Sequence, residues 1–218
     1  MAEINLMRFY PRQQGRRAQR PRITDEDRRV ARRFDQNYFD GDRRHGYGGF
    51  RYHERFWTDT VRLFRDHYRL SEDAAVLDVG CAKGFMLYDF FKQMPKARLA
   101  GVDISAYALS HAIDMLKPSL QRASAASLPF RDNSFDLVIA VNAIHNLPYE
   151  ECKQSVREIQ RVTRQHAFIM VDAWKTEEQR QDLLNWVLTP LTMLHADDWL
   201  QLFAEAGYTH DYYWWTVC

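Results

Sequence analysis

Apolar residues recur with two different periods along this chain of 218 residues, and the change of period divides it into two regions. In the first region an apolar stripe at helical spacing predicts a helix over about 50–70, and it consists of Trp57, Val61, Phe64 and Tyr68. After residue 71, short apolar runs alternate with amphipathic segments, as expected for parallel strands covered on both faces. The alternation predicts an α/β fold with a doubly wound, mostly parallel sheet of six to seven strands. Four of the strands are expected over 74–80, 98–104, 134–141 and 166–174.

Helices are predicted between and after these strands. The apolar spacing favours helices over 83–94, 105–116, 176–188 and 196–206. A further helix between the last two of the four strands has an apolar face formed by Cys152, Val156, Ile159 and Thr163. After Gly207 there is room for one more strand, in which alternation sends Tyr213 and Trp215 to one face and Tyr212 and Trp214 to the other.

The N-terminal part of the chain has a different character. Residues 8–22 combine Pro, Gly and Gln without apolar periodicity, and they carry Arg8, Arg12, Arg16, Arg17, Arg20 and Arg22. Thr24, followed three residues later by Asp27, resembles a capping box that opens a short helix ending near Phe34. We therefore divide the chain into a flexible basic arm, an N-terminal helical lid that contributes to a substrate pocket, and the main domain, over residues 1–23, 24–70 and 71–218.

The net charge of +1 conceals an asymmetry, because residues 1–55 carry an excess of Lys and Arg and the remainder an excess of Asp and Glu. A basic arm can contact nucleic acid, but arginine-rich termini are more often solvated, and we favour that second interpretation. The scattered cysteines lack the spacing of a zinc or redox motif and indicate a reducing compartment. No apolar run near the start is long enough for a signal sequence or a membrane span. We therefore expect a cytoplasmic protein without a membrane contact.

The turn after the first strand is the strongest chemical signal. Ligands of open α/β sheets bind outside the carboxyl ends of the strands, where this turn reads Asp78-Val79-Gly80-Cys81-Ala82-Lys83-Gly84. Gly80 and Gly84 allow the backbone to turn and to approach a ligand closely. The second strand ends in Asp103, whose carboxylate can accept hydrogen bonds from both hydroxyls of a ribose. The spacing GxxxG differs from the GxGxxG of dinucleotide-binding folds, so the pattern favours a nucleoside without a pyrophosphate.

Three motifs make the chain resemble the class I S-adenosylmethionine-dependent methyltransferases, in particular the group similar to the ubiquinone and menaquinone C-methyltransferases. The motifs are VLDVGCAKG (76–84), GVDIS (101–105) and LPFRDNSFDLVIA (128–140). The resemblance covers about residues 70–210 and implies a Rossmann-like fold, S-adenosylmethionine as the cofactor and methyl transfer as the activity. It also implies a C-terminal hairpin, for which this chain is too short. We expect the resulting sheet edge to be exposed, and a homodimer that covers it is one interpretation.

The resemblance assigns the cofactor site residue by residue. In the family the first loop surrounds the methionine part, the acid matching Asp103 holds the ribose, and Ile104 packs against adenine. The family commonly has an Asp before an Ala to receive the adenine amino group, whereas this chain has Ser124-Ala125. The expected cofactor-binding residues are Asp78, Gly80, Cys81, Ala82, Gly84, Asp103, Ile104, Ser124, Ala125 and Asn142.

Residues 142–148 follow the strand expected over 134–141. In this family the matching loop lies beside the transferred methyl group, and here it supplies the catalytic candidates Asn142 and His145. Methyl transfer to an OH or NH group needs the two groups in line and the removal of a proton, and a histidine is the usual base. The alternative is that His145 only packs against the cofactor. No metal site is expected, because the paired acids and Asn of magnesium-dependent members are not matched.

The substrate pocket is expected to include His145 and, from the segment before the first strand, Tyr47, Tyr52 and Arg55. Aromatic rings can contact a sulfonium or a cationic acceptor, and an arginine can bind a carboxylate or phosphate. A glycine-rich turn followed by an ordinary amphipathic helix is an equally good explanation of this segment.

The leading interpretation is methyl transfer to a small-molecule acceptor at an N, O or C atom, because no nucleic-acid-binding domain is recognisable. Two alternatives stay open at this point. One is an RNA or protein methyltransferase guided by the basic arm, and the other is a protein that binds S-adenosylmethionine without methylating.

Overall fold

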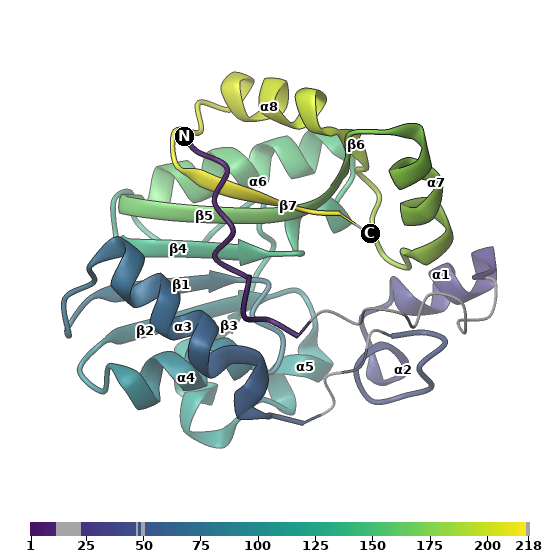
Figure 1. The fold of residues 1–218 in the computed structure, drawn as a ribbon. Helices are drawn as coiled ribbons and strands as arrows, with labels where there is room; N and C mark the ends of the chain where they lie inside the picture. The colour runs from purple at the N-terminus through teal and green to yellow at the C-terminus, as the bar shows by residue number, and fades with distance from the viewer. Residues whose placement is uncertain (12–22, 47, 49–50, 217–218) are drawn as a thin grey trace.

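A seven-stranded sheet in which every pairing is parallel forms the centre of the molecule (Figure 1). The computed structural model describes residues 1–11, 23–46, 48 and 51–216. The strand order is β3-β2-β1-β4-β5, with β6 and β7 both paired to the long strand β5. The strands are β1 (Ala75–Val79), β2 (Arg98–Asp103), β3 (Leu120–Arg122), β4 (Phe135–Val141), β5 (Thr163–Trp174), β6 (Leu194–His195) and β7 (Asp211–Trp215).

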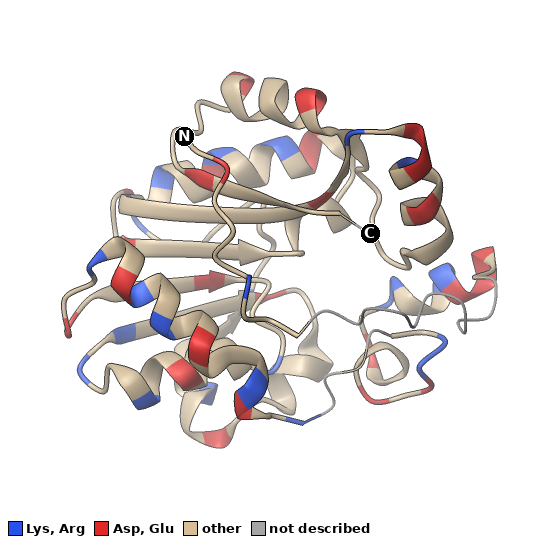
Figure 2. Cartoon of the chain, viewed as in Figure 1, with Lys and Arg blue, Asp and Glu red and all other residues tan. Residues whose placement is uncertain are grey.

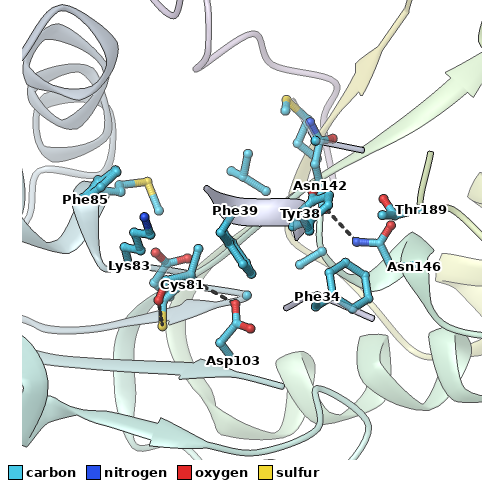
Figure 3. Close-up of a pocket in the computed structure, with 18 of the residues that line it drawn as sticks. Phe34, Tyr38, Phe39, Cys81, Lys83, Phe85, Asp103, Asn142, Asn146 and Thr189 are labelled. Atoms are coloured by element: carbon cyan, nitrogen blue, oxygen red, sulfur yellow. Dashed lines mark hydrogen bonds between the residues drawn. The ribbon is translucent and has the colours of Figure 1, made fainter. Parts of the chain in front are cut away.

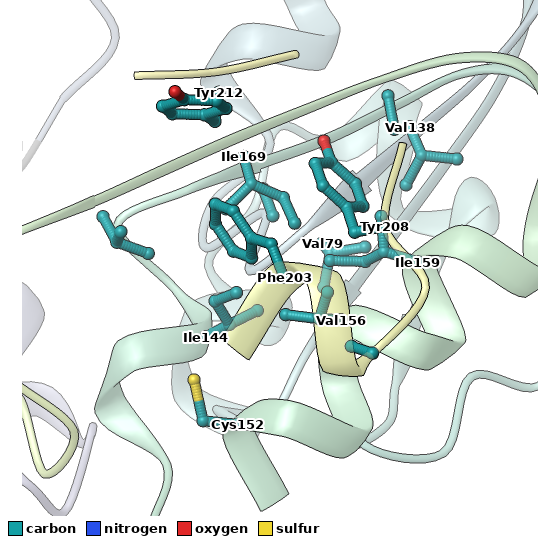
Figure 4. Packing of buried hydrophobic residues seen from close by; sticks show 14 of the residues in the cluster. Val79, Val138, Ile144, Cys152, Val156, Ile159, Ile169, Phe203, Tyr208 and Tyr212 are labelled. Carbon is teal, nitrogen blue, oxygen red and sulfur yellow. The ribbon is translucent and has the colours of Figure 1, made fainter. Parts of the chain in front are cut away.

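Helices cover both faces of the sheet, which confirms the doubly wound α/β architecture. Apolar side chains of α6 and α8 pack with the sheet in one core, and those of α3 and α4 pack on the opposite face. Figure 4 shows the first core, where Cys152, Val156 and Ile159 of α6 and Phe203 of α8 meet the strands. The helices are α1 (Asp25–Ala31), α2 (Gln36–Phe39), α3 (Glu54–Tyr68), α4 (Phe85–Gln93), α5 (Ala106–Ser110), α6 (Tyr149–Val162), α7 (Glu177–Trp186) and α8 (Ala196–Glu205), with 3-10 helices η2 (Asp114–Ser119) and η3 (Ile144–Asn146).

The expected helix over 105–116 is wrong in its second half. Helix α5 ends at Ser110, and the amide of Ile113 donates to the carbonyl of Lys83 in the first loop instead of continuing the helix. A 3-10 helix follows and leads directly into the short strand β3, which the apolar pattern did not predict. Thr163 was also misplaced, because α6 ends at Val162 and Thr163 begins β5. In both cases a tertiary hydrogen bond or strand pairing determines the boundary.

The free sheet edge expected at β7 is covered by the chain's own first residues. Ile4 N donates to Tyr212 O at 2.9 Å, and Tyr212 N donates to Ala2 O at 3.0 Å. Leu6 and Met7 are each 1% exposed and belong to the core that faces α3. The described part of the expected flexible arm therefore packs on the domain, because it brings both strand pairing and apolar side chains. The edge gives no reason for a homodimer.

The rings of β7 confirm the predicted alternation. Tyr212 and Trp214 are buried in the core with α8, and Tyr213 and Trp215 pack toward the core with α3. Residues 12–22, which hold most of the arginines of the expected arm, lie outside the described residues.

Charged residues lie mainly on the outer helices, and acidic and basic side chains are mixed there, as on α1 and α7 (Figure 2). The strands are largely free of charge, as burial requires. Among the described residues, no helix combines the length and apolar character needed to cross a bilayer.

Candidate active site

A cavity of about 1150 Å³ opens at the carboxyl ends of β1, β2, β4 and β5. Its walls come from the first loop, the loop after β4, the segment 34–46 and the start of α3. Figure 3 shows Cys81 and Asp103 toward one side, Asn142 and Asn146 toward another, and the rings of Phe34, Tyr38 and Phe39 around the same space. The position agrees with the general rule for ligands of open α/β sheets.

The first loop can form only with glycine at its turn. Gly80 has φ +85°, and a Cβ built on it would lie 2.3 Å from Cβ of Ala143 in the loop after β4. The backbone of Gly80 therefore packs directly against the methyl group of Ala143, with no room for a further side chain between the two loops. Ala82 also has positive φ, +48°, and its amide donates to Asp103 Oδ2 at 2.8 Å. The loop is thus fixed in shape by contacts to two neighbouring strands.

Gly84 has a different place from the one expected. It is the N-cap residue of α4 with φ +76°, and a Cβ on it would contact Leu116 and Leu120, not the cavity. It allows α4 to begin close to η2 and does not line the cavity wall. The other expected residues of the first loop, Asp78, Gly80, Cys81 and Ala82, do line it.

Two carboxylates face the cavity, the buried Asp78 from β1 and the half-buried Asp103 from β2. Burial, together with the nearby Asp103, raises the pKa of Asp78 to about 8. Burial also raises the pKa of Asp103, although amide hydrogen bonds from Ser105 and Ala82 oppose this. Each oxygen of Asp103 accepts one amide and keeps a second lone pair for a ligand hydroxyl. In the described structure the carboxylate of Asp78 accepts no hydrogen bond, so a cationic ligand group would compensate its charge.

Beyond Asp103, the same wall of the cavity becomes more apolar. Ile104 lines the cavity and is 50% exposed, which is unusual for an isoleucine and leaves its side chain free to contact a flat apolar group. Ser124 and Ala125 also line the cavity. Ser124 Oγ already accepts the amide of Ala126 at 3.2 Å. The serine that stands where the family commonly has Asp is therefore partly engaged within its own turn.

The loop after β4 brings Asn142 and His145 to the opposite wall. Asn142 has φ +51°, a conformation that is rare outside glycine, and its carbonyl accepts the side-chain amide of Asn146 at 3.2 Å (Figure 3). Its amide donates to Met170 O of β5 at 2.9 Å. Such strain is maintained only where the surrounding contacts impose it.

His145 is not placed as a free base. Its ring is 2% exposed, and burial lowers its pKa to about 3. Its Nδ1 accepts the amide of Asp172 at 3.0 Å, so the neutral ring carries its hydrogen on Nε2. The only lone pair that could take a proton is thus already used. In this arrangement His145 can donate a hydrogen bond, but it cannot accept a proton from a ligand.

An ion-pair cluster connects the segment before α3 to the first loop. Lys83 Nζ lies 2.6 and 2.7 Å from the two oxygens of Asp40, which follows α2, and Tyr107 donates to the same carboxylate at 2.8 Å. Burial raises the pKa of Asp40, but the hydrogen bonds from Lys83 and Tyr107 outweigh it and hold the pKa below its usual value. Ser105 Oγ also donates to Phe34 O at 2.5 Å. This contact set holds the rings of Phe34 and Phe39 at the cavity.

The other end of the same segment is attached to the last turn of α7 and to the loop that follows it. Arg32 Nη2 donates to Pro190 O at 2.9 Å, and Arg28 Nη2 donates to Leu184 O at 2.7 Å. The segment is closed on itself by Arg44, whose Nε lies 2.6 Å from Asp27 Oδ1 and holds the pKa of that carboxyl well below its usual range. Residues 24–46 therefore span the cavity from the first loop to the loop after α7.

The expected substrate-binding residues are only partly brought together. Arg55 lines the cavity and its guanidinium lies 4.8 Å from the centre of the Phe56 ring. Tyr52 does not line it, because its hydroxyl accepts Lys92 Nζ at 2.6 Å and its ring packs against Tyr88 of α4. Tyr47 lies outside the described residues.

Other residues line this part of the cavity that sequence reasoning did not find. Aromatic rings meet where Tyr10 lies 5.0 Å from Trp57 and 6.4 Å from Trp215, measured between ring centres. The missed residues come from segments far apart in sequence, so no local spacing indicates them; they are Tyr10, Phe34, Tyr38, Phe39, Trp57, Lys83, Asp172 and Trp215. For Lys83 alone a signal existed, since it lies inside the loop motif. Among the residues that the structure describes, no three His, Cys, Asp or Glu side chains are grouped as a metal site would require.

The fold and site define a class, and comparison with known proteins agrees with it. Residues 76–166 match the family model described as a methyltransferase domain. The structure is similar to the crystal structure of YcgJ from Bacillus subtilis, with a TM-score of 0.54 and 20% identity over 67% of this chain and 66% of that one. Residues 76–166 therefore match a methyltransferase domain, and the fold around them resembles that of the class I, S-adenosylmethionine-dependent methyltransferases.

Within that class the chain is similar to the quinone C-methyltransferase group. It is 28% identical to the demethylmenaquinone methyltransferase of Lactiplantibacillus plantarum over 65% of this chain and 63% of that enzyme. It is 31% identical to an uncharacterized protein of Haemophilus influenzae, over 63% of this chain and 59% of that protein. It is also 28% identical to the tRNA (carboxymethyluridine(34)-5-O)-methyltransferase of Arabidopsis thaliana, over 60% of this chain and 31% of that enzyme. The chain thus matches less than two thirds of the length of each of these relatives.

The residues present fit S-adenosylmethionine. The uncompensated carboxylate of Asp78 suits a cationic amino group, the free lone pairs of Asp103 suit two ribose hydroxyls, and the exposed Ile104 suits a flat base. The backbone contact of Gly80 with Ala143 leaves the cavity side of the loop open. These features line the same cavity at the carboxyl ends of β1 and β2, where one ligand can reach all of them.

Proposed function

We propose that this protein transfers the methyl group of S-adenosylmethionine to a small-molecule acceptor. The observation that supports this most directly is the shape of the cavity. It continues past the cofactor wall into a space lined by the segment 34–46 and by the aromatic rings around Tyr10. A cavity lined by aromatic rings at the carboxyl ends of the strands suits a compact acceptor better than a polymer.

The residues that line the cavity suggest a role for each of its walls. When bound, the cofactor supplies a methyl group on a positively charged sulfur, from which a nucleophile can remove it by in-line displacement. Asp78, Asp103 and Ile104 would hold the cofactor by its amino, ribose and base parts, while residues 24–46 act as a lid that excludes water. Arg55, at the cavity wall, would attract an acidic group of the acceptor. The buried free cysteines Cys81 and Cys152 are consistent with our placing the reaction in a reducing cytoplasm.

The test is to incubate the purified protein with methyl-labelled S-adenosylmethionine and a metabolite extract, and then to separate small molecules, RNA and protein. Label in one small-molecule product, absent without the protein, is the expected result. Calorimetry with S-adenosylhomocysteine measures cofactor binding separately.

RNA is a second candidate acceptor, because one of the relatives is a tRNA methyltransferase. Label in the RNA fraction, with a rate that falls steeply as salt rises, would replace our proposal by that one. Cofactor binding without label in any fraction would instead indicate a protein that binds S-adenosylmethionine for another purpose.

A further inference from the structure

Asp172 is a buried carboxylate that lies outside the wall assigned to the cofactor. It lies near the end of β5, is 8% exposed, and faces the cavity on the side of the loop after β4. Within the described part of the chain its carboxylate accepts no hydrogen bond, and Nε2 of the titratable His145 lies 3.8 Å from Oδ2. A buried, unpaired carboxylate is unfavourable, so a ligand or a proton must compensate it.

The groups around Asp172 fix its position without neutralising it. Helix α8 contributes Trp199, whose indole N–H donates to the carbonyl of Asp172 at 3.1 Å, and β7 places Trp215 opposite it in register. Helix η3 contributes His145, whose Nδ1 accepts the amide of Asp172. The His145 carbonyl accepts the amides of Leu191 and Thr192, so this helix is itself held in place.

The pair has one member that can accept a proton. His145 is neutral and its remaining nitrogen carries a hydrogen, so it can only donate, and that nitrogen lies 3.8 Å from Oδ2 of Asp172. We propose that Asp172 accepts the proton that the acceptor loses during methyl transfer, and that the acceptor is therefore a compound with a hydroxyl or amino group. This inference rests on the proposed function.

The step balances without any further reactant. A lone pair of the acceptor oxygen or nitrogen forms the bond to the methyl carbon, and the carbon–sulfur bond breaks with its electron pair left on sulfur. The proton of the acceptor O–H or N–H passes to a carboxylate oxygen of Asp172 and from there to solvent after the products leave. His145 is a positioning residue, because its Nδ1 accepts the amide of Asp172 and so holds the backbone that carries the carboxylate.

The protonation behaviour of the site agrees with this role. Burial raises the pKa of Asp172 to about 7, so near neutral pH the carboxylate is present in a useful fraction and is still basic enough to take a proton. Asp78, Glu151, Lys83 and Arg55 line the same cavity. Of these, Asp78 lies on the cofactor wall and is expected to pair with the cofactor instead.

The variant Asp172→Asn tests the proposal, because it keeps the shape and the backbone donor to His145 but removes the basic oxygen. The matched control is Asp198→Asn, which neutralises an exposed carboxylate on α8. With labelled S-adenosylmethionine and the metabolite extract, we expect Asp172→Asn to lower label transfer at least about 100-fold, the usual size of a general-base effect. Its dissociation constant for S-adenosylhomocysteine should stay within about threefold of the original protein, and its melting temperature should not fall.

The pH profile separates a basic group from a structural one. The original protein should show a rate that rises with pH and levels off above about pH 7, and this limb should be absent from Asp172→Asn and present in His145→Gln. An undiminished rate in Asp172→Asn, or loss of the limb only in His145→Gln, would overturn the proposal.

A readout without any acceptor keeps the two proposals distinguishable. Infrared difference titration of the original protein against Asp172→Asn, in the presence of S-adenosylhomocysteine, reports the protonation of this one carboxyl. A midpoint near pH 7 supports the proposal, whereas a midpoint below about pH 5, typical of a solvated carboxyl, overturns it. If no label is transferred by the original protein, the proposed function fails, and the titration still decides whether Asp172 has the protonation state that a base requires.

Discussion

The two walls of the cavity are built in different ways. The cofactor wall consists of two strand ends and their turns, and its main contacts, such as Ala82 N to Asp103, join residues about twenty positions apart. The facing wall combines residues 7–11, the segment 34–46, the loop after β4 and the ends of β5 and β7. The first wall is thus a local property of the sheet, whereas the second exists only when distant segments are assembled. We expect changes in the first wall to abolish cofactor binding and changes in the second to affect release and turnover.

The largest effect is expected from Gly80→Val, which breaks the first wall. The new side chain would overlap Ala143 and would also force a branched residue to φ +85°, so the protein should lose roughly 2–4 kcal/mol of unfolding free energy. Affinity for S-adenosylhomocysteine should fall at least about 100-fold. Urea denaturation and calorimetry measure the two effects.

The matched control is Gly207→Ala, which introduces the same kind of backbone strain at φ +73° with nothing within 4 Å of the new Cβ. It should cost only about 1 kcal/mol and leave cofactor affinity unchanged. Equal losses of affinity in both variants would show that the loop contact at Gly80 is not special.

A smaller effect is expected from Asp78→Asn. Because the pKa of Asp78 is raised to about 8 in the free protein and a cationic ligand group would lower it, binding releases a proton. Affinity of the original protein for S-adenosylhomocysteine should therefore rise with pH, by up to about tenfold per unit, and level off above pH 8. The variant should bind about 10- to 100-fold more weakly at pH 8.5 and lose this slope.

The same carboxyl gives an independent stability readout without ligand. Burial favours the protonated form of Asp78 and so raises its pKa in the folded protein to about 8, against an ordinary value of 3.8. The contribution of this carboxyl to folding stability is therefore complete below about pH 4 and is lost as pH rises toward 8. The stability of Asp78→Asn should decline less over that range. A flat binding profile in the original protein, or identical stability profiles, would contradict the assignment.

The connection between the two walls is tested by Asp40→Asn. This change leaves the buried Lys83 beside a neutral amide and removes the charge that joins the segment 34–46 to the first loop. S-adenosylhomocysteine should dissociate about three- to tenfold faster, with a smaller change in association, because weakening of a contact acts mainly on release. Stopped-flow tryptophan fluorescence measures both rates.

Asp25→Asn is the control for this variant, since Asp25 is fully exposed on the outer helix α1 and its one ion pair among the described residues is with Arg28, three residues later. It should release the ligand at the original rate. An Asp40→Asn variant with the same behaviour would mean that the segment 24–46 does not act as a lid.

The smallest effect is expected from Ser124→Ala. Because Ser124 Oγ is already engaged by the amide of Ala126, its loss should weaken binding of S-adenosylhomocysteine by less than about threefold, which corresponds to under about 0.7 kcal/mol. Calorimetry provides the measurement. A tenfold loss would show that the serine replaces the family's Asp as a partner of adenine.

The sequence was informative wherever function depends on consecutive residues. The order of strands and helices, the turn at Gly80, Asp103 at the end of β2 and the alternation in β7 all follow from local patterns that the structure reproduces. It was misleading where a tertiary partner intervenes. Helix α5 stops because Ile113 bonds to Lys83, and the first residues pack because β7 offers a free edge.

Short-range turns and apolar periods encode the class of fold and the wall that would hold the cofactor, so both can be predicted from the residues alone. The character of the facing wall depends on how distant segments assemble. Their assembly pairs Lys83 with Asp40, turns Tyr52 away from the cavity, and places Asp172 beside a histidine that has no free lone pair. The reason is physical: burial and hydrogen-bond partners set the protonation and direction of these side chains, and both are fixed only when segments distant in the chain come together.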